Sequence, residues 1–164
     1  MIEGQLIRKS GQSSPHAGTV RRVNIWLLRT FGLSAVRCQL PIEVASEDQE
    51  RNEPEPDVAV TTDPEFDHFT RHPRGDESTL LVEIADASSP LDHTVKRALY
   101  ARALVPEYWV VDLRARALFV HRHPASGHYR QVIRLSEDET VAPDSRPDAV
   151  VKVSELLPHT PPAA

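Results

Sequence analysis

A single glutamate inside an apolar run constrains this chain more than any other feature. Residues 80–85 read Leu-Leu-Val-Glu-Ile-Ala, and the turn-forming Ala-Ser-Ser-Pro follows at 87–90. A short apolar run bounded by turn residues predicts a buried strand, in which Glu83 shares its face with Leu81 and Ala85. A buried carboxylate is costly unless a cation, a metal ion or hydrogen-bond donors compensate it. The run therefore predicts either a neutralised structural residue or a site that binds something positive.

Length and composition favour one globular domain. The chain has 164 residues, of which 40% are hydrophobic and 26% are charged, which is ordinary for a globular protein. The single cysteine, Cys38, excludes an internal disulfide framework and fits a reducing compartment. No apolar run is long enough to span a membrane, and the first residues lack an apolar signal-peptide core. We therefore expect a cytoplasmic protein without a membrane partner.

The charges are segregated along the sequence. The net charge is −5, yet residues 43–92 hold fifteen acidic and three basic side chains, whereas residues 93–134 hold eight basic and two acidic ones. The basic segment is compatible with a surface that binds phosphate groups. It is equally compatible with solvated faces that keep the protein soluble, so charge alone leaves both interpretations open.

Hydrophobic periodicity predicts an alternation of helices and strands. A helix is expected over 16–31 and a second one over about 94–104, with Asp92 as its N-cap. Strands are expected at 36–44, 57–60, 80–85, 108–112, 118–122, 129–135 and 149–153. This order predicts a single-domain α/β fold over residues 1–158, with a mixed β-sheet flanked by helices. Residues 159–164 are expected to form a Pro-rich disordered tail.

Three side chains are candidates for one site. Asp57 begins a short strand, Glu83 lies inside the next strand, and Lys96 belongs to the helix that follows. Asp92, Lys96 and Tyr100 are spaced four residues apart and therefore share a helical face. If the two strands pair, both carboxylates can bind one hard cation such as Mg²⁺, with Mn²⁺ as an alternative. A lysine beside such an ion can orient water or stabilise the charge that develops on a phosphate.

The same residues carry a resemblance to a known family. The run VEIADASSPLDHTVKRALYARALVPEYWVVDL, preceded by EPEPDVAV, resembles the Uma-two family of restriction-endonuclease-like proteins, which looks like a branch of the PD-(D/E)XK nuclease superfamily. The resemblance extends over nearly the whole chain, from the opening Glu-Gly to the Pro-Glu-Tyr-Trp at 106–109. It implies a restriction-endonuclease-like fold and a metal-dependent endonuclease that acts on nucleic acid, with DNA as the expected substrate.

Two positions depart from the pattern. The superfamily's Glu-X-Lys motif would place a lysine at position 85, where this chain has Ala85, so the resemblance implies that Lys96 is the counterpart of that lysine. Family members tend to carry serine or leucine at position 85 and glycine at position 104, where Leu104 stands here. Neither departure removes a proposed ligand.

The expected site has two groups of residues. Asp57, Glu83 and Lys96 form the catalytic set, and Asp57 and Glu83 are the expected metal ligands. The supporting set is Glu3, His16, Asp92 and Tyr100. Three of these residues also have a structural explanation: Asp92 as a helix cap or as the residue that orients the lysine, Tyr100 as packing, and His16 as a core histidine.

The rival hypothesis is a non-catalytic module that binds nucleic acid or another protein on the same fold. The intact set of Asp57, Glu83 and Lys96 favours the enzyme. DNA versus RNA, sequence specificity and homodimer formation all stay open at this point.

Overall fold

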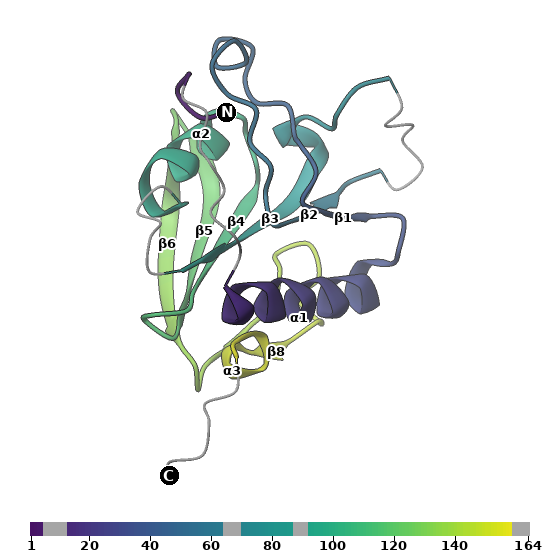
Figure 1. Cartoon of the computed structure of the whole chain (residues 1–164), viewed down its shortest axis with the longest axis vertical. Helices are drawn as coiled ribbons and strands as arrows, with labels where there is room; N and C mark the ends of the chain where they lie inside the picture. Colours follow the sequence, from purple (N-terminus) through teal and green to yellow (C-terminus); the bar gives the residue numbers. More distant parts are fainter. Residues whose placement is uncertain (5–12, 64–69, 87–91, 159–164) are drawn as a thin grey trace.

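A six-stranded sheet forms the centre of the computed structural model, which describes residues 1–4, 13–63, 70–86 and 92–158 (Figure 1). The strands lie in sequence order from β1 to β6. They are β1 Val36–Cys38, β2 Val58–Thr61, β3 Ser78–Ala85, β4 Glu107–Asp112, β5 Ala117–Ala125 and β6 His128–Ser136. Strands β3 and β4 pair in parallel and the other neighbours are antiparallel. The predicted mixed sheet of a single α/β domain is therefore confirmed.

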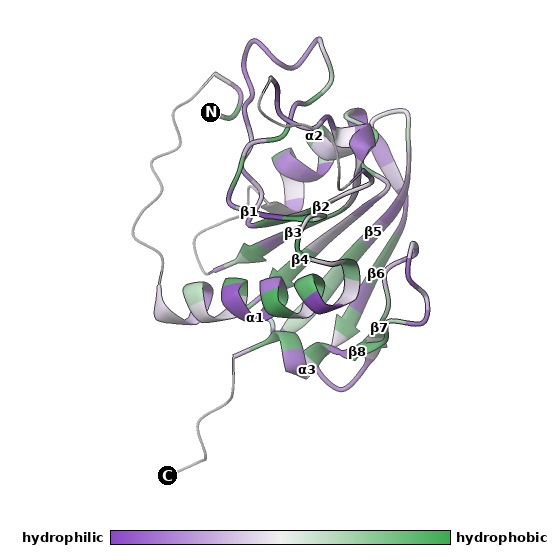
Figure 2. Cartoon of the chain, turned by 90° about the vertical axis from the view of Figure 1, so that its right-hand side faces the viewer, coloured by the Kyte–Doolittle hydropathy of each residue, from purple (hydrophilic) through white to green (hydrophobic). Residues whose placement is uncertain are grey.

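Helix α1, Ser14–Phe31, begins earlier than the apolar periodicity predicted. Its N-cap is Ser13, whose side chain accepts a hydrogen bond from the backbone N–H of His16. The helix ends at Gly32, whose φ of 91° suits a residue without a Cβ. Figure 2 shows polar and apolar colours alternating along α1, as expected for a helix with one face against the sheet.

The helix that follows β3 begins with a π-helical turn. This turn, η2, spans Asp92–Lys96, and the α-helix α2, Arg97–Arg102, continues it. The α2 segment leads into β4, so it provides the expected crossover between the two parallel strands. The C-terminal part of the described chain holds a two-stranded sheet and one short helix: β7 Thr140–Val141, β8 Val151–Lys152 and α3 Val153–Leu156.

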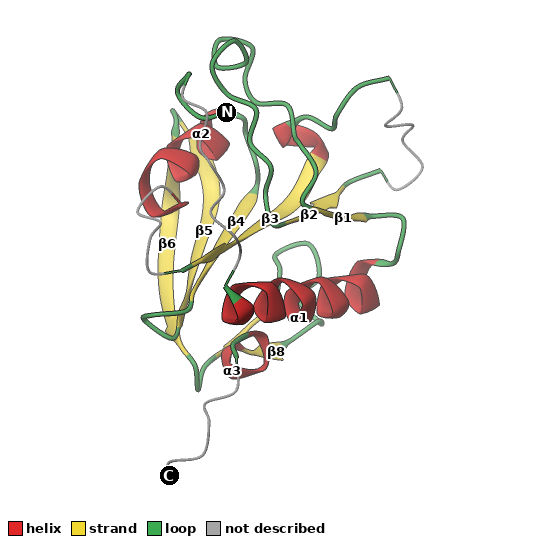
Figure 3. Ribbon diagram, viewed as in Figure 1, coloured by secondary structure: helices red, strands yellow, loops and turns green. Residues whose placement is uncertain are grey.

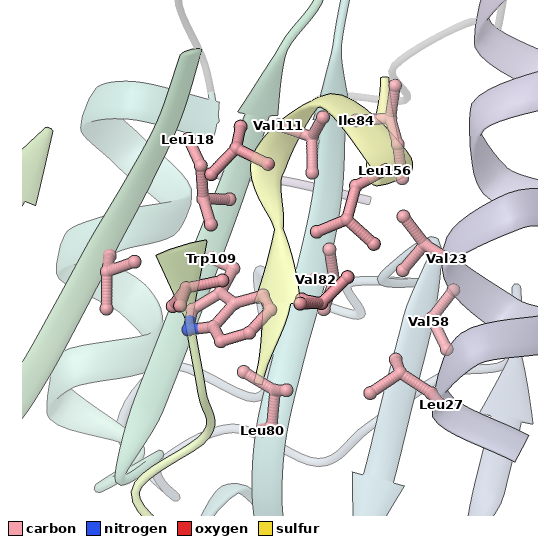
Figure 4. Packing of buried hydrophobic residues seen from close by; sticks show 14 of the residues in the cluster. Val23, Leu27, Val58, Leu80, Val82, Ile84, Trp109, Val111, Leu118 and Leu156 are labelled. Carbon is pink, nitrogen blue, oxygen red and sulfur yellow. The ribbon is translucent and has the colours of Figure 1, made fainter. Parts of the chain in front are cut away.

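The sheet buries apolar side chains on both faces, in two separate clusters. On one face, Val23 and Leu27 of α1 point toward Val58 and Val82, as Figure 4 shows. On the other face, Leu81 packs with residues of α2. The alternation predicted for residues 80–85 is confirmed, because Leu80, Val82 and Ile84 belong to the first cluster and Leu81 and Ala85 to the second.

Two strand predictions were wrong in extent. The alternation over 36–44 yields only Val36–Cys38, because Gln39 adopts a positive φ of 53° and turns the chain away from the sheet. The long loop that follows extends beyond one end of the sheet (Figure 3). The strand expected at 149–153 shortens to β8 and pairs with β7 instead of joining the main sheet.

The predicted Pro-rich tail at 159–164 lies outside the described residues. In the described part of the chain, the helices are too short or too polar to cross a lipid bilayer.

Candidate active site

Glu83 lies in the middle of β3 and is 3% exposed. Its Oε1 atom lies 2.9 Å from Nζ of Lys96 and accepts a hydrogen bond of 2.8 Å from the hydroxyl of Tyr100. The buried carboxylate is thus compensated by an ammonium and a phenol, both supplied by the segment that follows β3. Charge-assisted contacts of this kind are the compensation that burial of a carboxylate requires.

The π-helical turn places Lys96 at this carboxylate. Lys96 is the last residue of η2, and the α-helix begins at Arg97. A π turn is wider than an α turn and is found mostly as a single turn near functional sites. Lys96 and Tyr100 then lie four residues apart on one helical face, and both reach Oε1 of Glu83.

Asp57 lies directly across from Glu83. Strands β2 and β3 are antiparallel, and Val58 pairs with Val82, so Asp57 just before β2 takes the position opposite Glu83. Side chains at directly opposed positions point to the same face and lie close together. Two carboxylates in this arrangement repel each other unless cations lie between or beside them.

Each carboxylate has its own cationic neighbour. Nε2 of His16 lies 3.4 Å from Oδ2 of Asp57, and the backbone N–H of Ile84 donates to the same oxygen at 2.9 Å. Burial raises the pKa of Asp57, but the hydrogen bonds from His16 and Ile84 outweigh it. With the positive charges of His16 and Lys96 added, the pKa of Asp57 lies below its ordinary value, so this carboxylate is ionised at neutral pH.

His16 is held against Asp57 by the start of α1. The Ser13 hydroxyl caps the helix and also donates to Oδ2 of Asp86 at 2.5 Å, so it ties the helix to the end of β3. The hydrogen bond with Asp57 raises the pKa of His16; burial opposes this effect, and the nearby charges of Asp57, Asp86 and Glu83 reinforce it. Nδ1 of His16 is buried and has no hydrogen-bond partner among the described residues.

The structure brings together most of the residues expected from sequence. Asp57, Glu83 and Lys96 are neighbours, and His16 and Tyr100 contact two of them directly. Their catalytic roles stay predictions.

Glu3 and Asp92 differ from the rest of the supporting set. The backbone N–H of Glu3 donates to Asn52, and its exposed side chain lies within electrostatic range of Arg102, near the end of α2. In the described residues no contact joins Glu3 to the three catalytic candidates, so the structure does not bring it to the site. Asp92 begins η2, but its side chain lies outside the described part of the chain.

Sequence reasoning missed three polar neighbours of the site. Nε2 of His93 lies 3.2 Å from Oδ2 of Asp112, at the end of β4, and Gln39 donates to Oδ1 of Asp57 at 3.5 Å. Asp112 pairs with Ala85, two residues beyond Glu83 on the same face. The signal was the three-residue spacing from His93 to Lys96, but no local pattern links position 93 to position 112.

Asp57 and Glu83 are the side chains best placed to hold a metal ion. In the part of the chain that the structure describes, no group of three or more His, Cys, Asp or Glu side chains is arranged to do so. The donor set nevertheless fits Mg²⁺, which commonly binds one or two carboxylates and fills its other positions with water and substrate phosphate. The opposed carboxylates, with the pKa of Asp57 held low, supply hard anionic oxygens suited to that ion.

A purely structural role would account for part of this arrangement. Buried ion pairs can neutralise charges without any function, and the contact between Lys96 and Glu83 pairs two opposite charges. The gathering of four ionisable side chains at one place is nevertheless typical of an active site; here they are His16, Asp57, Glu83 and Lys96. Such a set can bind a divalent cation and place an ammonium beside a bound phosphate.

Comparison with known proteins agrees with the fold. The family Uma2, described as "Putative restriction endonuclease", matches residues 1–154. A crystal structure of a putative nuclease belonging to DUF820 from Anabaena variabilis ATCC 29413 superposes with a TM-score of 0.71 at 16% identity. The match covers 94% of this chain and 87% of that one, and at this identity it establishes the fold alone. No curated protein matches the sequence.

Because the family match spans nearly the whole chain, the protein belongs to the Uma2 family of restriction-endonuclease-like proteins.

Proposed function

We propose that this protein is a metal-dependent endonuclease that hydrolyses phosphodiester bonds of nucleic acid, with DNA as its substrate. One observation carries the proposal. Buried Glu83 on β3 lies opposite Asp57, which precedes the neighbouring strand β2, and Glu83 is held by Lys96 and Tyr100. Membership of a family described as restriction endonucleases supports the same reaction class.

In this mechanism Asp57 and Glu83 hold the metal ion, with Mg²⁺ as the expected ion and Mn²⁺ as an alternative. The bound ion supplies Lewis-acid chemistry, which polarises a phosphate oxygen and favours the ionisation of water. Hydrogen bonds from His16 and Ile84 keep Asp57 ionised and fix its orientation. Tyr100 fixes the orientation of Glu83 through the bond to Oε1.

Lys96 is proposed to act on the reacting phosphate. Its ammonium lies at Oε1 of Glu83, beside the carboxylates that hold the ion. Water attacks phosphorus, the bond from phosphorus to the leaving oxygen breaks, and a proton passes to that oxygen. An ammonium placed against the charge that develops on the phosphate oxygens lowers the barrier of this step.

The competing hypothesis is a module on the same fold that binds nucleic acid or a protein without cleaving it. The two hypotheses differ in the role of Asp57 and Glu83: the enzyme needs both carboxylates for cleavage, whereas the binding module needs them only to stabilise the fold. The opposed, buried carboxyl groups of Asp57 and Glu83 favour the enzyme, because clustered buried ionisable groups are typical of active sites.

The test is a cleavage screen on single- and double-stranded DNA and RNA, with Mg²⁺, Mn²⁺ or Ca²⁺. We expect cleavage of DNA with Mg²⁺ or Mn²⁺ and none by Glu83→Gln or Asp57→Asn. Lys152→Ala is the matched control, because Lys152 pairs with Asp138 on an exposed surface near α3. Binding by the wild type without cleavage by any divalent ion would establish the non-catalytic module instead.

A further inference from the structure

A second group of side chains lies on the same sheet face as Glu83. In the register of the sheet, Glu83 pairs with Val110, Val110 with Phe119, and Phe119 with Arg134. Side chains of such a cross-strand row point to one face, so the row leads from the candidate active site across β4 and β5 to β6 (Figure 1). Neighbouring strands lie about 4.8 Å apart, which puts the backbone of Arg134 about 14 Å from that of Glu83.

The outer end of this row is built from an aromatic ring, a guanidinium and an imidazole. The guanidinium carbon of Arg134 lies 6.0 Å from the centre of the Phe119 ring, within the range of a cation–π contact. The imidazole of His93 meets the same ring edge to face, with centres 4.8 Å apart. His93 is also fixed by Asp112, so both groups are held in place before any ligand arrives.

Arg97 extends the positive charge along the helix. It follows Lys96 directly and is exposed, and its charge lowers the pKa of buried His121 on β5. Within the described residues neither Arg97 nor Arg134 forms an ion pair, whereas Arg102, further along α2, is paired with Asp48. The acidic groups that act on this cluster are Asp112, which binds His93, and Glu139, which lies within electrostatic range of Arg134.

We propose that His93, Arg97 and Arg134 bind the sugar–phosphate backbone of a nucleic-acid strand next to the phosphodiester held at Asp57 and Glu83. This inference rests on the proposed nuclease function and adds the path of the substrate. The occupant follows from charge complementarity and from continuity with the active site, since Lys96 and Arg97 are adjacent and the row starts at Glu83. Arginine side chains without ion-pair partners are well suited to phosphate oxygens.

Phe119 acts as a positioning residue in this proposal. Its ring supports the guanidinium of Arg134 and so reduces the freedom that Arg134 loses when a phosphate binds. Replacing the ring with an aliphatic side chain removes this support and leaves the number of charges unchanged.

The test measures the affinity of a fluorescein-labelled DNA oligonucleotide by anisotropy in Ca²⁺, over a series of salt concentrations. Arg134→Gln and Arg97→Gln should each weaken binding about 5- to 10-fold near 0.1 M salt and reduce the salt slope by about one. Phe119→Leu should weaken binding with an unchanged slope. Arg29→Gln removes an exposed arginine from the last turn of α1, on the opposite sheet face, and should leave the affinity at the wild-type value.

Cleavage data separate the failure of this inference from failure of the nuclease proposal. Single-turnover cleavage at subsaturating protein should slow in Arg134→Gln in proportion to its loss of affinity, whereas Arg29→Gln should cleave at the wild-type rate. If the wild type cleaves DNA and Arg97→Gln and Arg134→Gln bind as tightly as Arg29→Gln, the proposed path is wrong and the nuclease proposal stands. If the wild type neither binds nor cleaves any nucleic acid, both are wrong.

Discussion

The ammonium of Lys96 lies 2.9 Å from Oε1 of Glu83, and this contact joins a π-helical turn to the centre of the sheet. The usual Glu-X-Lys motif would supply its lysine from position 85 on the strand itself. In this chain Ala85 occupies that position and packs in the core of the same face. The ammonium reaches the carboxylate from the helix instead, as the family resemblance predicted.

The first prediction concerns the role of Lys96. If its charge acts on the transition state, Lys96→Ala should lower single-turnover cleavage about 10²- to 10³-fold, by analogy with the loss of one oxyanion donor. Nucleic-acid affinity in Ca²⁺ should fall far less, because one phosphate contact among several is a small part of binding. An affinity loss as large as the rate loss would instead assign Lys96 to substrate binding.

Binding of a divalent ion at the proposed site should raise the thermal stability of the protein. Divalent ions that bind the folded protein raise its free energy of unfolding, by about 2.7 kcal/mol when the free ion is at a hundred times its dissociation constant. Mg²⁺ or Mn²⁺ should therefore raise the melting temperature of the wild type and not that of Asp57→Asn.

Glu50→Gln is the control for metal binding elsewhere, because Glu50 is exposed in the acidic loop between β1 and β2. It should respond to the ions as the wild type does. Equal stabilisation of wild type and Asp57→Asn would place the ion outside the proposed site.

Tyr100 should contribute to both stability and activity. Its hydroxyl is buried and donates to Oε1 of Glu83, which also contacts the ammonium of Lys96, and hydrogen bonds to charged groups contribute about 1.5 to 3 kcal/mol. Tyr100→Phe should lower the free energy of unfolding by about that amount in urea titrations and should slow cleavage.

Tyr129→Phe is the matched control for Tyr100→Phe. The hydroxyl of Tyr129 is also buried, but it donates to the neutral backbone carbonyl of Val105 and not to a site carboxylate. Tyr129→Phe should lower the free energy of unfolding by about 1 kcal/mol and leave the cleavage rate unchanged. A cleavage defect of equal size in both variants would mean that Tyr100 acts only through general stability.

The sequence predicted the site better than it predicted the chain segments around it. The alternation at 80–85 was enough to place Glu83 on the face of α2, because strand periodicity is strict. Spacing alone also placed Lys96 and Tyr100 on one helical face. The π turn was not predictable, since a wider turn of one residue leaves no distinct pattern in the apolar positions.

Contacts between distant segments account for the other differences. The pairing of His93 with Asp112 and the tie from Ser13 to Asp86 join residues that only the folded sheet brings together. The shortened β1 depends on the positive φ of Gln39, a conformation that the alternating pattern around it did not signal.

The buried histidine of β5 predicts a pH dependence of stability. Burial lowers the pKa of His121 to about 4, against an ordinary value of 6.5, even though its Nδ1 contacts the carbonyl of Tyr108. The unfolded chain then binds a proton between about pH 6.5 and 4 that the folded protein does not, so stability should fall as the pH is lowered through this window.

One pKa unit corresponds to about 1.4 kcal/mol, so His121 should account for a loss of about 3 kcal/mol across that window. His121→Asn retains an N–H that can donate to the Tyr108 carbonyl and lacks the titrating group. Urea titrations at several pH values should give a shallower decline for this variant than for the wild type. Parallel curves would mean that the pKa of His121 is the same in the folded and the unfolded chain.

The last prediction concerns Leu104, at a position where the family resemblance led us to expect glycine. Leu104 has a φ of 58°, and the backbone N–H groups of Leu104 and Val105 donate to the carbonyls of Ala101 and Tyr100. This is the hydrogen-bond pattern of a Schellman motif at the end of α2, in which the left-handed position favours glycine.

A side chain in this conformation costs about 1 to 2 kcal/mol, and Leu104 recovers little of it by burial because it is 56% exposed. Leu104→Gly should therefore raise the free energy of unfolding by about 1 kcal/mol, after the greater freedom of glycine in the unfolded chain is counted. Leu104→Ala removes the same exposed side chain but keeps the Cβ, so it should show no such gain. Both variants are compared with the wild type by urea denaturation. Equal stability of the glycine and alanine variants would show that the left-handed backbone at position 104 carries no strain.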